Sequence, residues 1–368
     1  MNSIRPPHSE IKKTDLYRDA NALIEIGRKS LEAEWSKDFL VWKYLSNPAG
    51  TYYSHCAEIG DIPVGFYSDI PVWLSLNGQL KTGAQAVDAV VALDVRRYGL
   101  FVKIAKRNYK QMDQENILLD YAFPNPVSEA GFIKRLGWTS VGRVPRYIRL
   151  LDASALSDKD QNSRIKAWAS RALSASIYAF TAWSGPAQGA GIQVRDVSIF
   201  DERFDRLWQQ AARDFPIAVV RNTAYLNWRY IQNPLQHYQA LIAERGADLA
   251  GFCTISYRDR KISRSAALTE LLVAPGDVQA GLVLLDEASR CARQAGSTQI
   301  QCWMLPNHNF YVSLLKRSGF LFWPNHFLPG MLRYTTPFII RLRPGTSPDP
   351  DPRVLGNWFL TMGDHDYY

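Results

Sequence analysis

The feature that most constrains this chain is a nine-residue stretch that occurs twice. Leu40–Pro48 reads LVWKYLSNP, and Leu226–Pro234 reads LNWRYIQNP. The tryptophan, the tyrosine and the Asn-Pro pair agree, and Lys43 is matched by Arg229. Further pairs keep the same separation: Asp15 and Asp201, Asp19 and Asp205, Tyr52 and Tyr238, Glu58 and Glu244, and Gly65-Phe66 and Gly251-Phe252.

Farther along, the separation becomes shorter by four residues and then stays constant. The later pairs are Asp88 and Glu270, Gly99 and Gly281, Pro124-Asn125 and Pro306-Asn307, and Gly137 and Gly319. One register with one gap indicates two copies of a fold of about 150 residues, an ordinary domain size. We therefore expect a first domain at 1–150, a linker with a bracing helix at 151–190, a second domain at 191–343 and an extended tail at 344–368.

Composition narrows the class of protein. The chain has 368 residues and a net charge of +8, which suits an anionic ligand but is too mild and scattered to indicate nucleic acid. Its four cysteines lie far apart, so we expect neither a zinc site nor a disulfide framework. The same cysteine pattern indicates a reducing, cytoplasmic compartment. The most apolar long stretch, 167–183, is interrupted by Arg171 and does not predict stable membrane insertion.

Each copy has the same predicted order of elements. Two helical segments are followed by three strands, a turn opening a helix, a short apolar strand, a second helix that ends at a glycine, and final strands. Gly60-Asp61 and Asn77-Gly78 read as hairpin turns. The fold class is therefore α/β of the α+β type, with a mixed, mostly antiparallel sheet flanked by helices in each domain. In the tail, 357–362 is apolar enough to dock on a domain, and Asp364-His365-Asp366 is expected as a solvated end rather than a metal site.

The chemistry-bearing stretch of the first copy follows its third long strand. The strand 85–93 runs into Asp94-Val95-Arg96-Arg97-Tyr98-Gly99-Leu100-Phe101, which opens a helix. Backbone N–H groups at a helix start bind phosphate, glycine lets it approach closely, and arginine adds charge.

In this order of elements the sequence resembles the GNAT (GCN5-related N-acetyltransferase) superfamily, with both halves similar to GNAT domains. Arg96 and Gly99 match the Arg/Gln-x-x-Gly-x-Gly/Ala pyrophosphate turn of that family, whereas Phe101 departs from it. The segment from Pro124 to Trp138 resembles the second cofactor-side motif of the family.

The resemblance implies an acyl-CoA ligand between two splayed strands of the first domain. Its pantetheine would pair with Val91, Ala92 and Leu93. The implied cofactor set is completed by Arg96, Arg97, Tyr98, Gly99, Leu100, Phe101 and Asn125. The turn of the second domain, 278–283, has neither arginine, so that domain is expected to be degenerate and to play a structural or cleft-shaping role.

Acyl transfer to an amine needs a base for the amine proton. Family members often place a carboxylate where Asp88 stands, although a salt-bridged structural carboxylate is the alternative. Family members often have a tyrosine in the last helix that acts as the general acid for the leaving thiolate. That helix of the first domain carries Phe132 and Ile133 and has no tyrosine. Trp42 and Tyr44 are candidate substrate-binding residues, or else anchors of a helix on the sheet.

The resemblance thus implies a tandem-GNAT N-acetyltransferase that uses acetyl-CoA and acts on an amine acceptor such as an amino-sugar. We expect it to be cytoplasmic and to need no metal. Two alternatives remain open. One is a peptidoglycan-bridge-type aminoacyl transferase, and the other is a GNAT-like CoA-binding protein that has lost catalysis.

Overall fold

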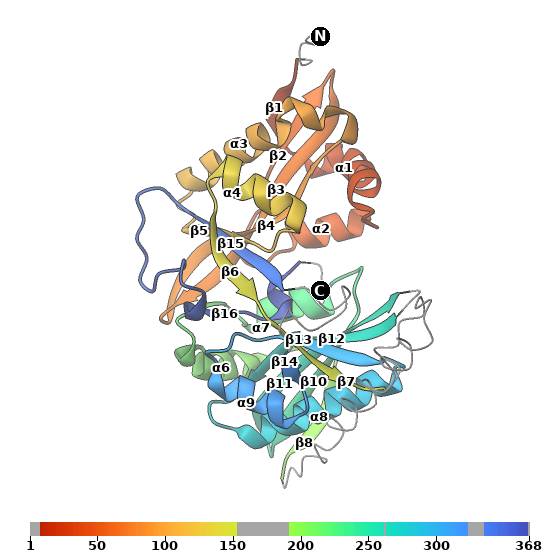
Figure 1. Cartoon of the computed structure of the whole chain (residues 1–368), viewed down its shortest axis with the longest axis vertical. Coiled ribbons are helices and arrows are strands. Elements are labelled where there is room, and N and C mark those ends of the chain that lie inside the picture. The colour runs from red at the N-terminus through yellow and green to blue at the C-terminus, as the bar shows by residue number, and fades with distance from the viewer. Residues whose placement is uncertain (1–7, 153–190, 261–262, 323–334, 367–368) are drawn as a thin grey trace, which may run out of the picture. The chain divides into compact units, whose positions relative to one another are not determined.

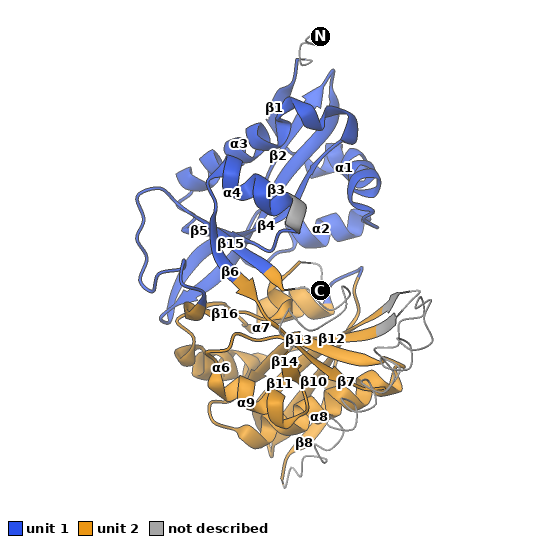
Figure 2. Cartoon of the chain, in the orientation of Figure 1, with its two compact units in different colours: residues 1–142, 232–235, 337–355 blue, residues 143–231, 236–336, 356–368 orange. Residues whose placement is uncertain are grey.

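The computed structural model describes residues 8–152, 191–260, 263–322 and 335–366. The chain divides into two compact units (Figures 1 and 2). Unit 1 comprises residues 1–142, 232–235 and 337–355, and unit 2 comprises 143–231, 236–336 and 356–368. The expected helix of the 151–190 linker lies outside the described residues, because only residues 151 and 152 of that linker are described.

Unit 1 is built on one mixed sheet with strand order β1-β2-β3-β4-β5-β15-β6. Its helices are α1 (Leu16–Leu31), α2 (Lys37–Leu45), the 3-10 turn η1 (Leu93–Tyr98), α3 (Leu100–Gln114) and α4 (Pro126–Leu136). Its strands are β1 (Glu10–Lys13), β2 (Tyr53–Ile59), β3 (Ile62–Leu76), β4 (Gln79–Val91), β5 (Leu119–Ala122), β6 (Thr139–Val144) and β15 (Thr336–Leu342).

Unit 2 repeats this plan with strand order β14-β7-β13-β12-β11-β10-β8. Its strands are β7 (Arg146–Leu150), β8 (Gln193–Val197), β10 (Tyr238–Arg245), β11 (Asp248–Arg260), β12 (Ser263–Val273), β13 (Gln299–Trp303) and β14 (Leu321–Phe322), with the short pair β9 (Ile217–Val219) and β16 (Trp358–Phe359). Its helices are α6 (Glu202–Ala211), η3 (Ala212–Asp214), α7 (Thr223–Leu226), the π-helical η4 (Asn227–Ile231), α8 (Val278–Gln294), α9 (Asn309–Arg317), η6 (Leu355–Asn357) and η7 (Met362–Asp364).

Local chemistry accounts for most of these boundaries. Asp15 caps α1 through its side chain, and Ser36 caps α2. The β2–β3 hairpin turns at Gly60 and Asp61, and the β3–β4 hairpin at Asn77 and Gly78, all with positive φ as two-residue hairpin turns require. The fold class expected from the sequence is confirmed: two mixed, mostly antiparallel sheets, each flanked by helices.

The two copies also share their irregularities. The β2–β3 ladder shifts register between Ala57 and Glu58, and the β10–β11 ladder shifts at the equivalent Ala243 and Glu244. A bulge bends a strand and re-aims its side chains, so a shared bulge is a shared geometric requirement. The duplication read from the sequence therefore extends to details of strand pairing.

Each sheet contains a strand from the other half of the sequence. The strand β7 lies at the end of the first expected domain in sequence, yet it pairs antiparallel with β13 in unit 2. The strand β15 lies at the end of the second expected domain, yet it pairs antiparallel with β5 in unit 1. The compact units are therefore interleaved in sequence, whereas the repeat alone suggests consecutive domains.

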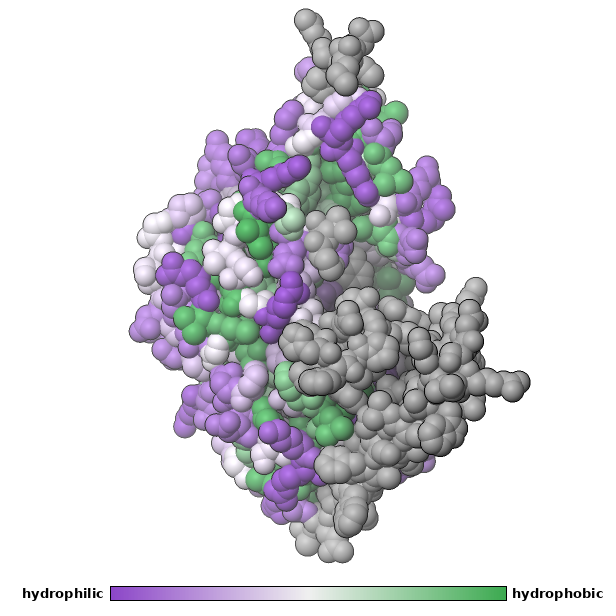
Figure 3. Space-filling model, in the orientation of Figure 1, coloured by the Kyte–Doolittle hydropathy of each residue, from purple (hydrophilic) through white to green (hydrophobic). Residues whose placement is uncertain are grey.

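On the face drawn in Figure 3, hydrophilic and hydrophobic residues are interspersed over the described part of the chain.

Candidate functional site

The candidate site of unit 1 lies where β4 and β5 separate. These parallel neighbours pair only at Ala84 with Asp120 and Gln85 with Tyr121. The strand β4 continues to Val91, paired on its other side with β3, while β5 ends at Ala122. We call the space beside residues 86–91 of β4 the β4–β5 wedge. In open α/β sheets, ligands bind outside the carboxyl ends of such strands.

A β-bulge marks the wall of this wedge. Ala86 pairs with Asp69 and Asp88 pairs with Ser68, so Val87 is an extra residue in β4. Unit 2 has the same bulge, because Leu268 pairs with Ile255 and Glu270 with Thr254, leaving Thr269 as the extra residue. Bulges are frequent beside active sites, where they redirect side chains and backbone groups.

The turn after β4 leads into the start of α3 at Gly99. Gly99 has φ 70° and ψ 18°, a left-handed conformation, and a Cβ there would meet no atom within 4 Å. The glycine is therefore required by the backbone, and the space beside it is open. No side chain caps α3, so its first N–H groups remain available to a ligand. Arg96 and Arg97 are exposed; Arg96 Nε donates to Val91 O at 3.0 Å, and Arg97 lies over the Tyr98 ring.

The remaining predicted cofactor residues have varied surroundings. Leu93, the first residue of η1, is 63% exposed, whereas Val91 and Leu100 are buried. The Ala92 N–H donates to Val64 O at 2.8 Å, so it already serves the ladder to β3. Phe101 packs edge-on against Tyr67 and Phe132 in the core. Asn125 accepts the Ser128 N–H at 2.9 Å and thereby caps α4.

Asp88 lies on β4 in a buried ionic cluster. Its side chain is 1% exposed, the Lys43 ammonium lies 2.8 Å from its Oδ2, and the Tyr44 hydroxyl donates to the same oxygen. Trp42 is buried as well and packs on Phe39. Lys43 was not singled out as a functional residue from the sequence. Its match to Arg229 in the repeat, at a buried face of α2, was the available signal.

Unit 2 contains the counterpart of this cluster with a different cation. Glu270 Oε2 accepts from the Tyr230 hydroxyl at 3.3 Å, as Asp88 accepts from Tyr44. Arg221 Nε lies 3.2 Å from Glu270 Oε2, and Arg221 Nη2 lies 2.7 Å from Asp364 Oδ2. Burial raises the pKa of Glu270 above its usual value, although Arg221 acts in the opposite direction. The carboxylate–tyrosine pair is thus common to both copies.

The start of α8 in unit 2 is already occupied by an acid. This helix begins at Val278, and the Asp277 carboxylate accepts the Ala280 N–H at 3.0 Å. Arg245 pairs with Asp277 at 3.2 Å. A carboxylate at a helix N-terminus takes the position and the charge that a phosphate would have. Unit 2 therefore lacks both the arginines and the uncapped helix start of unit 1.

The C-terminal tail differs from expectation in one respect. The apolar residues Trp358, Phe359, Leu360 and Met362 are buried against unit 2, so the docking expected from the sequence is confirmed. The expectation of a solvated end at 364–366 was wrong, because Asp364 is 1% exposed and paired with Arg221. The polar sequence of the tail gave no sign of its partner Arg221, because Arg221 lies more than a hundred residues away from Asp364 in sequence.

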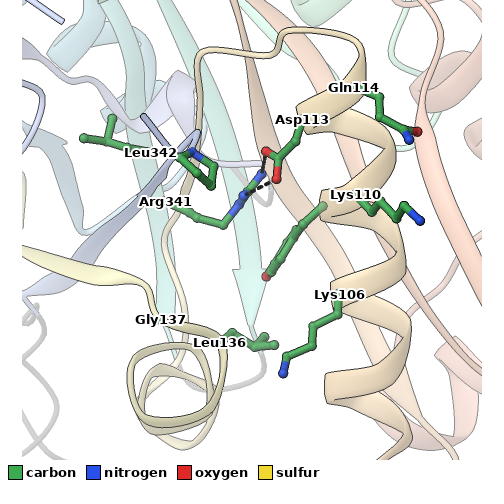
Figure 4. Close-up of a pocket in the computed structure, with 10 residues that line it drawn as sticks. Lys106, Lys110, Asp113, Gln114, Leu136, Gly137, Arg341 and Leu342 are labelled. Carbon is green, nitrogen blue, oxygen red and sulfur yellow. Dashed lines mark hydrogen bonds and ion pairs between the residues drawn. The ribbon is translucent and has the colours of Figure 1, made fainter. Parts of the chain in front are cut away.

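A pocket of about 680 Å³ lies at the other end of α3 from the turn at Gly99. Figure 4 shows Lys106, Lys110, Asp113 and Arg341 around it. It faces the C-terminal half of α3 and the end of α4, away from the wedge, and we do not assign it to the chemistry. Among the described residues, no cluster of His, Cys, Asp and Glu could hold a metal, and no helix is long and apolar enough to cross a membrane.

Comparison with known proteins places the fold. No protein-family model matches the chain, and no curated protein matches its sequence. Among solved structures, a GCN5-related N-acetyltransferase from Anabaena variabilis is 10% identical with a TM-score of 0.61, covering 91% of this chain and 73% of that one. A probable N-acyltransferase from Enterococcus faecalis is 12% identical with a TM-score of 0.62 over the same shares. Saccharomyces cerevisiae N-myristoyltransferase with bound myristoyl-CoA is 14% identical with a TM-score of 0.58, covering 92% and 80%. The chain therefore has the GNAT fold, as the sequence resemblance predicted.

Proposed function

We propose that the protein is an acyl-CoA-dependent N-acyltransferase whose acyl-CoA site is the β4–β5 wedge of unit 1. The observation that carries the proposal is the difference between the two copies. Unit 1 has an uncapped helix start at Gly99 with two exposed arginines, whereas the equivalent helix start of unit 2 is capped by Asp277. The likeness in fold to an N-acetyltransferase and to an N-myristoyltransferase with bound myristoyl-CoA supports the same assignment.

In this proposal each part of the wedge has a role. The pantetheine arm lies along Val91, Ala92 and Leu93, and the pyrophosphate contacts the turn from Arg96 to Phe101, with Asn125 across the wedge. The acceptor amine attacks the thioester carbonyl, so a C–N bond forms and the C–S bond breaks. Asp88 takes the amine proton, directly or through a water, and Trp42 and Tyr44 shape the acceptor side. The released CoA thiolate takes up a proton.

The acyl group and the acceptor are the finer parts of the proposal. Acetyl is the simplest donor group and an amino-sugar our proposed acceptor, with the cytoplasm as the site of action. One of the compared structures holds myristoyl-CoA, so longer chains belong in the same test.

Titration calorimetry with CoA, acetyl-CoA, octanoyl-CoA and myristoyl-CoA tests the proposal. We expect one acyl-CoA molecule to bind per chain. We also expect turnover of the preferred donor with at least one amine of a panel, measured by the release of free CoA thiol. Binding without turnover on any amine would favour the non-catalytic alternative. No binding of any CoA ester would overturn the proposal and favour a donor of another kind, such as aminoacyl-tRNA.

A further inference from the structure

The second wedge of the molecule, between β12 and β13 of unit 2, is filled by the chain's own end. These parallel strands pair from Ser265 with Gln299 to Ala267 with Gln301 and then separate, as β4 and β5 do. Residues 356–366, which we call the C-terminal segment, lie beside the separated part. A Cβ on Gly363 would come within 1.9 Å of the Tyr230 hydroxyl oxygen and 3.1 Å of Thr269 O. On the β13 side, His365 packs on the Trp303 ring at 5.8 Å.

Two buried arginines bind the polar groups of this segment. Arg221 lies 2.7 Å from the Asp364 carboxylate and donates to Thr361 Oγ1 at 3.2 Å. Arg229 donates to the carbonyl oxygens of Gly363 and His365 at 3.2 and 2.8 Å. Hydrogen bonds from a charged donor are stronger than neutral ones, particularly away from water. The segment is thus recognised by its carboxylate and its backbone together.

Aromatic contacts fix the start of the segment. Trp358 and Phe359 form β16, which pairs parallel with β9. The Phe359 ring stacks on Phe215 with centroids 3.9 Å apart, and His308 Nε2 lies 2.8 Å from Trp358 O. Both aromatic residues of the segment are fully buried.

The equivalent positions of unit 1 show what this occupation changes. Ala86, Val87 and Ala89 on β4 are half-buried. Their counterparts Leu268, Thr269 and Leu271 on β12 are buried, and Gly363 of the C-terminal segment lies against Thr269. The same wedge is therefore accessible in one copy and closed in the other.

We propose that the β12–β13 wedge is a peptide-binding site, and that its ligand is the C-terminal segment of this same chain. The recognised features are a pair of aromatic residues, a glycine where a Cβ has no room, and an acidic side chain for Arg221. Occupation in cis excludes any other ligand from this wedge. This inference does not depend on the acyl-CoA assignment for unit 1.

Cutting the connection to the segment tests the proposal in the assembled protein. A protease recognition sequence is inserted after the exposed Ser347, and the full chain is folded and then cut. We expect the C-terminal fragment to co-elute with the body in gel filtration, and to be exchanged by an excess of fluorescent peptide covering residues 353–368. Immediate loss of the fragment, with an unchanged melting temperature of the body, would overturn the proposal.

Peptide variants test the recognised features. A peptide with Asp364→Asn should compete about 10- to 100-fold more weakly, because it loses a charged hydrogen bond to Arg221. A peptide with Gly363→Leu should not compete. Equal competition by all three peptides would mean that the association is non-specific, which contradicts the proposal.

A second measurement avoids cutting altogether. In the intact chain, Gly363→Ala should raise the amide hydrogen exchange of residues 358–366, because the added methyl group collides with Tyr230. Gly356→Ala is the matched control in the same segment, since its Cβ would meet only Asn307 at 3.9 Å. If Gly363→Ala leaves the exchange of the segment unchanged, the wedge does not bind it in the way described.

Discussion

Asp88 has a structural position in this fold besides the chemical role that we propose for it. In both copies a buried carboxylate accepts from a buried tyrosine: Asp88 from Tyr44, and Glu270 from Tyr230. The pair persists in unit 2, where the wedge is filled, so part of its role is to join the tyrosine-bearing helix to the sheet. A chemical role for Asp88 has to be measured separately from that structural one.

We predict that Asp88→Asn lowers kcat by about 10²–10⁴-fold while acyl-CoA still binds, because the amide cannot take the acceptor's proton. The same change leaves the Lys43 ammonium buried without its carboxylate, and removing one partner of a buried pair costs about 3–5 kcal/mol. Single-turnover rates, donor affinity and the free energy of unfolding are therefore measured together.

A double variant separates the two effects. Lys43→Met with Asp88→Asn removes the buried charge, so its stability should recover while its rate should not. Glu270→Gln, in the other copy, should change stability without changing the rate constant for acyl transfer. Turnover that returns in the double variant would remove Asp88 from the mechanism.

A second pair of buried acids predicts a pH dependence. Asp69 and Asp120 lie under α3 in the interior of unit 1. Burial raises the pKa of Asp120 to about 6, and burial together with the Asp120 charge raises the pKa of Asp69 well above its usual value. Ordinary aspartates in an unfolded chain titrate near ~3.9. The folded state therefore holds protons that the unfolded state has released.

The sign follows from that difference. The contribution of these two groups to the free energy of unfolding is therefore largest at or below about pH 4. It falls as the pH rises toward their pKa values in the folded state, by about 1.4 kcal/mol per pH unit for each proton. Asp69→Asn imitates the protonated acid, so its stability relative to the native protein should increase from pH 4 to pH 8. Urea unfolding at each pH measures this. Parallel curves for the two proteins would show that Asp69 keeps an ordinary pKa.

At the scale of elements, the two helix starts separate the copies. The first N–H groups of α3 have no side-chain cap, and those of α8 have Asp277. Arg96→Ala with Arg97→Ala should weaken acyl-CoA binding by a few kcal/mol, since each charged contact contributes about 1.5–3 kcal/mol. Gln279→Ala, at the equivalent turn of unit 2, is the control and should leave the affinity unchanged. Equal losses measured by calorimetry would refute a single site.

The sequence predicts elements well where the information is local. Gly60-Asp61 and Asn77-Gly78 are turns because their residues suit positive φ, and the repeat predicted that a second set of elements would follow the first. It could not predict the partners of β7 and β15. A five-residue strand such as Arg146–Leu150 has a suitable apolar pattern for either sheet, and only the completed molecule decides between them. Arg221 was missed for the same reason, since both of its acidic partners are distant in sequence.

At the scale of the whole molecule, the exchanged strands make each unit depend on both halves of the chain. The strand β15 stands between β5 and β6. Its Arg341 lies 2.9 Å from Asp113 (Figure 4). The same side chain lies 2.6 Å from the buried Asp120, and its guanidinium lies 4.3 Å from the centroid of the Tyr109 ring. Without β15, Asp120 would remain in the interior of the sheet without this cation, which is a costly arrangement.

We therefore predict that a fragment of residues 1–150 does not unfold cooperatively, although it contains a complete sequence repeat. Residues 1–144 joined by a flexible Gly/Ser linker of about ten residues to 336–355 should unfold cooperatively, because the linker can restore β15 beside β5. Urea unfolding followed by tryptophan fluorescence and far-UV circular dichroism compares the two. The matched control carries Arg341→Leu in the appended segment, which keeps the strand's apolar contacts but leaves Asp120 uncompensated, and it should lose about 3–5 kcal/mol. Cooperative unfolding of the 1–150 fragment on its own would mean that the exchange of β15 is dispensable, and that each repeat is a domain in its own right.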